Sequence, residues 1–436
     1  MSFARYGLGC ALAAVLLAGC RRNRHRAAAE AAPLAESAVG DAAPPSPLGE
    51  VAPVRAAEAS QARWRQITHG PRPRGVERWR FDLTPREALG EPATDGRTVF
   101  LAAARLDAEG PSEGEIFAFD LRDGSLRWHT AVEGLHGEPI EVIDGVVLVD
   151  TIRHCIRRGS DTPGSETRPC LESAPGAMIG LDAVTGVQRY RTAAASDAAQ
   201  ARWAIVSGSR SYFMHDGNQG FRELSVGSGG LGARLSLGAS IVTATGVHDD
   251  LLVVVEGRRG TELQRRATAA ALATRPRWSR PLPYRSSCQV VAGGSVAVVP
   301  AFTTPNLSGA ARGVSLMSGA DAWVQSETPL TVETCGAIEG PMFYQVLNGS
   351  LTTVHFVDGR SRASHRLGAQ VTSDFAAAMD GIFYHSVSGR LSGIDVVGGH
   401  ESVRVETGAH RVEGMVLWGG RGAVTTRAPG LVVGFE

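Results

Sequence analysis

Residues 116–128 have the sequence Ile-Phe-Ala-Phe-Asp-Leu-Arg-Asp-Gly-Ser-Leu-Arg-Trp, and this stretch decides the fold class. Its first half alternates as a half-buried strand does, and Asp123-Gly124 between two apolar runs is a strong β-hairpin signal. The second strand ends on a large aromatic side chain, Trp128. A single hairpin says little about a whole chain, but this one recurs, and the recurrence predicts the architecture.

Turn signals followed by apolar strands recur along the chain with a period of roughly 40 to 50 residues, the range of propeller blades. The turns are Asp95-Gly96, Asp144-Gly145, Ser207-Gly208, Asp249-Asp250, Gly293-Gly294, Glu339-Gly340, Asp380-Gly381 and Arg421-Gly422. Each unit continues with a copy of the opening hairpin. The copies are 178–190, 313–323, 353–365 and 391–403, with degenerate versions around 221–235 and 267–278. In this hairpin the Asp can bond turn amides, the Gly takes a positive φ, and the final aromatic can wedge between neighbouring sheets.

Each unit therefore contains four strands, and about eight units are present. The sequence predicts an all-β protein, an eight-bladed β-propeller of four-stranded antiparallel blades, with a seven-bladed ring as the alternative. Residues 431–436 match only the first strand of the hairpin. Residues 76–81, with Trp79, match the missing outer strand, so we expect the N-terminal strand to close the ring and to leave no orphan sheet edge.

The N-terminus has the pattern of a targeting segment, in which Arg5 precedes an apolar run over 6–16. The run closes with Leu17-Ala18-Gly19-Cys20, which resembles the lipobox of bacterial lipoproteins and implies cleavage before Cys20 and acylation of its thiol. An ordinary signal peptide that contains a cysteine is the alternative. The predicted organisation is a signal peptide (1–19), an acylated cysteine with a disordered tether (20–75) and a propeller (76–436). No later stretch is apolar enough to span a bilayer, so we expect a chain held by its lipid anchor.

Two of the six cysteines belong to this leader, and the remaining four suggest two disulfides in an oxidising compartment. Cys155 and Cys170 bracket a polar insertion, and a bridge between them would stabilise the fold by about 3 kcal/mol. Cys288 and Cys335 each lie five residues before a turn glycine of successive units. We expect a second bridge there, worth on the order of 4 kcal/mol.

The hairpins at Ala118-Phe119-Asp120…Asp123-Gly124…Trp128 and Leu181-Asp182…Thr185-Gly186…Tyr190 resemble the pyrroloquinoline-quinone-like propeller repeat. Together with the lipobox and tether they look like the propeller lipoproteins of the outer-membrane barrel-assembly machinery. This resemblance implies an outer-membrane location, facing the periplasm. The family also contains quinone dehydrogenases, which would be expected to have a calcium site, a catalytic Asp and usually an adjacent-cysteine disulfide; the sequence has no Cys-Cys pair.

Other candidate motifs have structural explanations. The glycine run 227–232 matches part of a dinucleotide-binding pattern, but in the repeat it is the hairpin turn of the third unit. The Asp120/Asp123 and Asp249/Asp250 pairs fall at turns, and the histidines lack metal-ligand spacing. The formal net charge is zero, which gives no signal for nucleic acid.

The sequence thus predicts a non-catalytic, membrane-anchored scaffold that binds other cell-envelope proteins as a monomer within a complex, without cofactor or metal. Three long loops, 105–113, 151–175 and 302–311, all join the second and third strands of a unit and would share one face, our candidate binding surface. The alternative is a propeller that binds a small ligand, such as a quinone or sugar, in its central channel. A structural part of a lineage-specific envelope complex is a third hypothesis.

Overall fold

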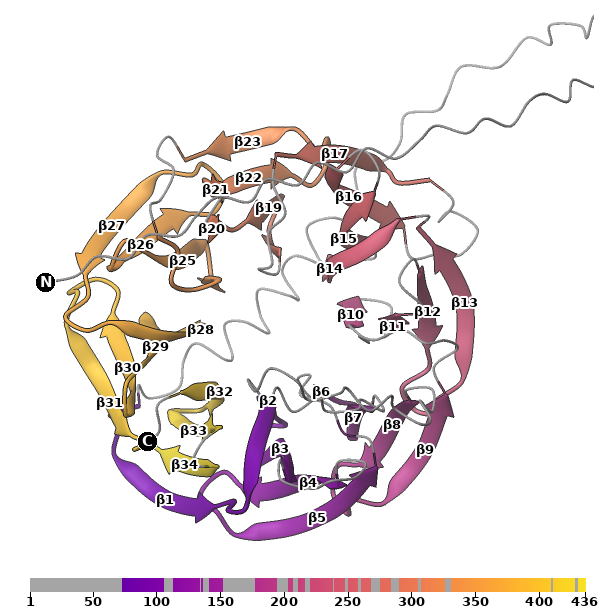
Figure 1. Cartoon of the computed structure of the whole chain (residues 1–436), viewed down its shortest axis with the longest axis vertical. Helices are drawn as coiled ribbons and strands as arrows, with labels where there is room; N and C mark the ends of the chain where they lie inside the picture. Colours follow the sequence, from indigo (N-terminus) through magenta and orange to yellow (C-terminus); the bar gives the residue numbers. More distant parts are fainter. Residues whose placement is uncertain are drawn as a thin grey trace, which may run out of the picture. The chain divides into compact units, whose positions relative to one another are not determined.

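The computed structural model is an all-β ring of eight four-stranded antiparallel sheets, and it contains no helix in the part of the chain that it describes (Figure 1). The eight-bladed propeller predicted from the repeats is therefore confirmed. The structure describes residues 73–105, 113–133, 135, 141–151, 177–193, 203–206, 211–215, 220–237, 239–247, 250–257, 260–267, 275–283, 290–304, 307–325, 331–408, 411–427 and 430–436. The chain divides at residue 51, and all of these residues belong to the second unit, 52–436.

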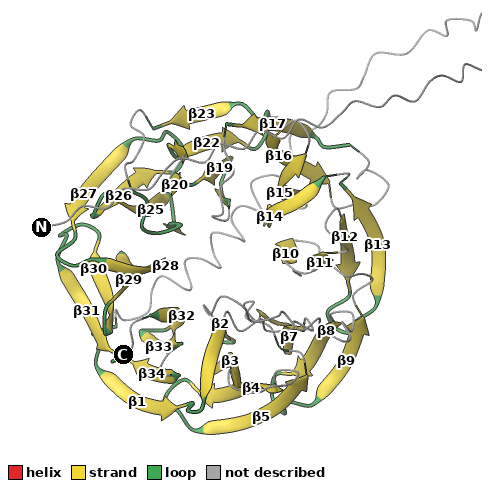
Figure 2. Ribbon diagram, in the orientation of Figure 1, coloured by secondary structure: helices red, strands yellow, loops and turns green. Residues whose placement is uncertain are grey.

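Each blade runs from an innermost first strand to an outermost fourth strand (Figure 2). Blades 1 and 2 contain β2 (Arg86–Thr94), β3 (Thr98–Arg105), β4 (Glu113–Asp120) and β5 (Leu126–Glu133), then β6 (Glu141–Ile143), β7 (Val146–Thr151), β8 (Ala177–Asp182) and β9 (Gln188–Ala193). Blades 3 and 4 contain β10 (Trp203–Val206), β11 (Ser211–His215), β12 (Gly220–Leu224) and β13 (Leu231–Ser236), then β14 (Ser240–Val247), β15 (Asp250–Gly257), β16 (Gly260–Ala267) and β17 (Trp278–Leu282).

The second half of the ring follows the same plan. Blade 5 contains β18 (Val291–Gly293), β19 (Val296–Val299), β22 (Arg312–Ser315) and β23 (Asp321–Val324), with a small extra hairpin of β20 (Phe302–Thr304) and β21 (Leu307–Gly309). Blade 6 contains β24 (Ala337–Glu339), β25 (Met342–Leu347), β26 (Ser350–His355) and β27 (Ser361–Arg366). Blade 7 contains β28 (Val371–Met379), β29 (Ile382–Val387), β30 (Arg390–Asp395) and β31 (Glu401–Glu406). Blade 8 contains β32 (Val412–Trp418), β33 (Arg421–Thr426), β34 (Leu431–Phe435) and β1 (Glu77–Asp82).

The ring is closed by the N-terminal strand, as the sequence predicts. Strand β1 pairs antiparallel with β34, and Arg80 lies opposite Val433. Beyond the paired strands, Val76 and Glu436 exchange backbone hydrogen bonds of 2.9 and 3.0 Å. Blade 8 is therefore built from the two ends of the described chain. Strand β1 is its outermost strand, as the fourth strand is in the other blades.

The core lies between blades. One cluster of buried side chains joins Phe100, Ile116 and Trp128 of blade 1 to Val147 and Ile179 of blade 2. Second strands such as β7 are buried along their whole length, which suits their near-continuous apolar sequence. Because both faces of each sheet are covered by neighbours, stability comes from a chain of blade-to-blade contacts.

Six turns between third and fourth strands have one geometry. In blade 1, Gly124 donates its N–H to the Asp120 carbonyl at 2.9 Å, and Asp120 donates to Ser125 at 2.9 Å. The turn glycines have φ between 69° and 72°, a left-handed conformation that favours glycine. They are Gly124, Gly186, Gly229, Gly319, Gly359 and Gly399. The run 227–232 falls in the blade 3 turn and at the start of β13, which confirms its structural interpretation.

In blades 8, 1, 2, 4 and 5 the aromatic at the end of the hairpin lies against the turn glycine of the next blade. The Trp128 ring covers Gly186, and its Nε1 donates to the Ala183 carbonyl at 3.1 Å. The same contact is made by Trp79 on Leu121, Trp278 on Leu316 and Trp323 on Phe356, with Nε1–O distances of 3.2, 2.7 and 2.9 Å. The predicted wedge between neighbouring sheets is confirmed, and in blades 8, 1, 4 and 5 a tryptophan fixes the blade to its successor with a ring contact and a hydrogen bond.

Candidate functional site

The ring has two faces with different loops. We call the side that carries the turns between first and second strands, and between third and fourth strands, the tight-turn face. The three long loops of the predicted binding surface lie on the opposite face, since they join second and third strands. Of these loops, residues 106–112, 152–176 and 305–306 lie outside the described residues, so this surface stays a prediction. Its one described part is the β20–β21 hairpin of blade 5.

The first predicted carboxylate pair serves the hairpin turn of blade 1. Asp123 accepts the Ser125 N–H at 2.9 Å, and Asp120 accepts the Arg122 N–H at 2.9 Å. The buried Asp120 carboxylate also binds the Arg127 guanidinium at 2.6 Å. These contacts are structural, which confirms the interpretation of Asp120 and Asp123 as turn residues.

The second pair differs from the prediction in one respect. Asp250 is the first residue of β15 rather than a turn residue, and Asp249 lies outside the described residues. The carboxylate of Asp250 is 2% exposed and is held by Arg265 at 2.6 Å and Arg277 at 2.9 Å. It is therefore a buried ion-pair centre of blade 4, because its strand starts one residue earlier than the turn pattern indicated.

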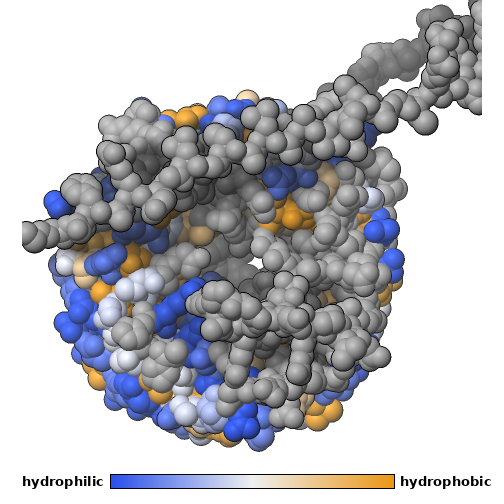
Figure 3. All heavy atoms as spheres, viewed as in Figure 1, coloured by the Kyte–Doolittle hydropathy of each residue, from blue (hydrophilic) through white to orange (hydrophobic). Residues whose placement is uncertain are grey.

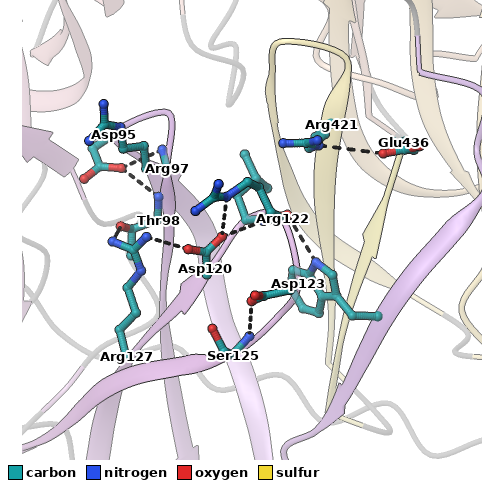
Figure 4. A network of polar contacts seen from close by, with 12 residues as sticks. Asp95, Arg97, Thr98, Asp120, Arg122, Asp123, Ser125, Arg127, Arg421 and Glu436 are labelled. Carbon is teal, nitrogen blue, oxygen red and sulfur yellow. Dashed lines mark hydrogen bonds and ion pairs between the residues drawn. The ribbon is translucent and has the colours of Figure 1, made fainter.

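A cavity of about 520 Å³ opens on the tight-turn face where blade 8 meets blade 1. We call it the seam cavity. It is lined by Arg97, Leu121, Arg122 and Arg127 of blade 1 and by Trp418 and Arg421 of blade 8. Figure 4 shows Arg122 and Arg127 directed at Asp120, while Arg421 lies with Glu436 on the neighbouring strands of blade 8.

The arginines of the seam cavity control the protonation of Asp120. Burial alone raises the pKa of this carboxyl, but hydrogen bonds from Arg127 and Arg122 outweigh that effect and lower the pKa to about 2. Asp120 is therefore ionised at neutral pH and holds the two guanidiniums in place. The arrangement resembles a prepared anion site, in which buried charge orients exposed cations.

Polar groups also occur on the innermost strands. Burial in β6 and the negative charge of Glu91 in β2 raise the pKa of Glu141 to about 7. No group of three or more His, Cys, Asp and Glu side chains is placed to hold a metal ion within the described ranges. Across the coloured part of the face seen in Figure 3, hydrophilic residues predominate and hydrophobic ones form small separate groups.

The predicted covalent sites fall mostly outside the described residues. This applies to the lipidation site Cys20 and to Cys155, Cys170 and Cys288. Cys335 lies two residues before β24 and is disulfide-bonded. Its pairing with Cys288 and the oxidising compartment stay predictions. No helix in the described residues has the length and hydropathy needed to cross a membrane.

The chain matches a family model described as outer membrane protein assembly factor BamB over residues 67–325. The chain belongs to this family. The match starts before β1 and ends directly after β23, so it covers the closing strand and blades 1 to 5. At the family level, a BamB-like propeller supports a protein-interaction scaffold in outer-membrane assembly, although the wider repeat family also includes dehydrogenases.

Solved structures confirm the fold. The crystal structure of BamB from Moraxella catarrhalis matches with a TM-score of 0.54 and 13% identity, over 82% of this chain and 98% of that chain. A computationally designed protein, Ika8, matches with a TM-score of 0.55 and 11% identity, over 84% of this chain and 99% of that chain. No curated protein matches the sequence. Because a natural and a designed structure match equally well, the likeness lies in the fold.

Proposed function

We propose that the chain is a lipid-anchored, non-catalytic scaffold that docks other proteins during outer-membrane protein assembly. The observation that carries this proposal is the family match, which spans the closing strand and five blades. The lipobox ending at Cys20 and the stretch up to residue 75 support an anchored location on the periplasmic side of the outer membrane. The long loops on a rigid ring supply the surface on which partners would dock.

The docking role is tested by mild crosslinking in intact cells, followed by purification of the tagged full-length chain. We expect barrel-assembly or other envelope proteins to be captured with it. A capture without any envelope protein would contradict the proposal. A Cys20→Ala variant serves as the control for anchoring, and we expect it to leave the membrane fraction.

The catalytic alternative has its own measurement. A quinone-dependent propeller would bind pyrroloquinoline quinone with calcium, and binding would raise the thermal unfolding midpoint of the purified chain. Our proposal expects no such shift and no spectral change of the quinone.

A further inference from the structure

The seam cavity has the size of a ligand site and lies where the ring closes. Its volume of about 520 Å³ falls within the usual range for small-molecule pockets. Blade 1 and blade 8 approach each other closely there, since the ring of Trp418 covers Gly96. Two blades thus contribute fixed walls to one hollow.

The wall from blade 8 departs from the repeat. In six blades two residues separate the paired ends of the first and second strands, so equivalent residues can be compared. The residue that starts the second strand is apolar in four of them, Val146, Val296, Met342 or Ile382. It is Asp250 in blade 4, where it is buried in ion pairs of its own blade, and Arg421 in blade 8. The residue that ends the first strand is Trp418 in blade 8, and it is 46% exposed. The wall of the seam cavity from blade 8 therefore contains an arginine and an exposed tryptophan at these two positions.

The wall from blade 1 departs from the repeat as well. The third residue of the turn between third and fourth strands is Arg122, where Val184, Met317, Val357 and Val397 stand in other blades. Arg97 comes from a loop that is one residue longer than the two-residue turns. By contrast, the Arg127–Asp120 ion pair has a counterpart in blade 2, the Arg189–Asp182 pair, with the same distance of 2.6 Å. We therefore assign the Arg127–Asp120 pair a structural role in the hairpin.

The acidic groups around the cavity leave its cations available. Asp120 is buried and shared by two arginines, and Glu436 is shared by Arg78 and Arg421, at 3.7 Å from the latter. The carboxylates of Asp95 and Asp123 accept backbone N–H groups of their own turns. No acidic side chain lines the cavity, and the Arg97 guanidinium has no ion-pair partner among the described residues. Arg122 remains 69% exposed.

We propose that the seam cavity binds an acidic peptide segment of a partner protein, whose carboxylates pair with Arg97, Arg122 and Arg421 while a neighbouring apolar side chain lies on Trp418. Guanidinium groups match carboxylates in a planar, bidentate geometry. A phosphate would use the same cations but would leave the exposed indole without a contact, so the mixed lining favours a peptide. This proposal rests on the docking role and names a partner chemistry for it.

The test is a titration of the purified chain with a fluorescein-labelled peptide in which glutamate and phenylalanine alternate, followed by fluorescence anisotropy. The double variant Arg122→Ala/Arg421→Ala should weaken binding at least about tenfold, and Trp418→Ala by several-fold. Arg360→Ala is the matched control, because Arg360 is 80% exposed on the tight-turn face of blade 6. It should leave the affinity unchanged. Thermal unfolding of each variant checks that the ring is intact.

Other results would overturn the proposal. Equal affinities for the double variant and for Arg360→Ala would exclude the seam cavity as the site. Equal binding of a peptide with glutamine in place of glutamate would exclude recognition of carboxylates. Direct binding of inorganic pyrophosphate or of anionic phospholipid vesicles, together with no binding of the peptide, would assign the cavity to phosphate. Failure of the docking role can be distinguished from failure of this proposal. Crosslinking in cells measures the capture of partner proteins, whereas the titration measures the affinity of the seam cavity for the peptide.

Discussion

The Nε1 of Trp79 lies 3.2 Å from the carbonyl oxygen of Leu121, to which it donates a hydrogen bond. Trp79 belongs to the strand that closes the ring, and Leu121 belongs to the hairpin turn of the next blade. The same ring also covers Gly124 of that turn. The first described strand therefore fixes blade 8 from both sides, through its pairing with β34 and through its contact with blade 1.

Replacing Trp79 by alanine should destabilise the protein strongly. The change empties the space between the two blades and leaves the buried Leu121 carbonyl without its donor, so we expect a loss of about 3–5 kcal/mol. Urea-induced unfolding measures it. Trp418→Ala is the comparison, because that indole is 46% exposed, and the smaller buried area predicts a smaller loss of about 1–2 kcal/mol. Similar losses for the two variants would show that the wedge contact contributes little.

The variants Gly186→Ala and Gly145→Ala distinguish two costs to stability, the strain of a positive φ and the clash of a new Cβ with a neighbouring ring. Both glycines have positive φ, 71° and 75°. A Cβ on Gly186 would lie 2.6 Å from the Trp128 ring, whereas a Cβ on Gly145 would meet nothing within 4 Å. We expect Gly145→Ala to cost about 1 kcal/mol and Gly186→Ala about 2–4 kcal/mol in denaturant unfolding. A loss at Gly145 that matches the loss at Gly186 would contradict the wedge as the reason for glycine there.

Tyr190 takes the wedge position of blade 2 without the hydrogen bond. Its ring covers Gly229, but its buried hydroxyl has no hydrogen-bond partner among the described residues. Tyr190→Phe should therefore leave the free energy of unfolding unchanged or raise it, while Trp128→Phe should lower it by about 1–3 kcal/mol. A marked loss for Tyr190→Phe would reveal a partner for the hydroxyl.

The same residue predicts an alkaline effect. Burial raises the pKa of Tyr190 from 10.0 to about 12, because the charged form is disfavoured in the folded chain. The unfolded chain loses this proton first, so the stability due to Tyr190 is complete below pH 10 and falls between about pH 10 and pH 12. Unfolding at several pH values should show this fall for the natural chain and a smaller one for Tyr190→Phe.

Asp120 predicts the opposite behaviour in acid. Its folded pKa of about 2 lies below the ordinary value of 3.8, so its contribution is present above about pH 4 and disappears as the pH falls towards 2. Asp120→Asn should lower stability at pH 7 by about 1–2 kcal/mol, and the difference from the natural chain should vanish near pH 2. A difference that stays constant with pH would assign the loss to packing instead of charge.

The predicted disulfides need chemical mapping. Non-reducing peptide mapping of the exported chain should find Cys335 joined to Cys288 and Cys155 joined to Cys170. Cys335 is disulfide-bonded in the structure, which agrees with the first pairing without naming its partner. Free thiols, or Cys335 joined to another cysteine, would contradict the prediction.

The number of blades and the closing strand were predictable because their signals are local. Turn glycines, alternating strands and a final aromatic lie within one hairpin, and each copy repeats them. The wedge of blade 6 was harder to place, since Ala363 stands at the tryptophan register. His365, two residues later on the same face of β27, covers Gly399 and contacts the Val396 carbonyl at 3.0 Å.

The seam cavity was not predicted, because it joins residues near position 100 to residues near position 420. No local pattern brings Arg122 and Trp418 together before the ring is closed. The available signal was a departure from the repeat, an arginine at position 421 where four other blades start a strand with Val, Met or Ile. Comparing equivalent positions of all blades would have marked this junction.

The pairing of β1 with β34 has a consequence for the order of assembly. During synthesis the strand that carries Trp79 is made before blades 1 to 7, yet its partner β34 is made after them. Until residues 431–435 exist, β1 has no strand to pair with, and blade 8 lacks its outer edge. The ring therefore closes only after β34 has been made, and a chain cut short before β34 keeps open sheet edges that invite aggregation.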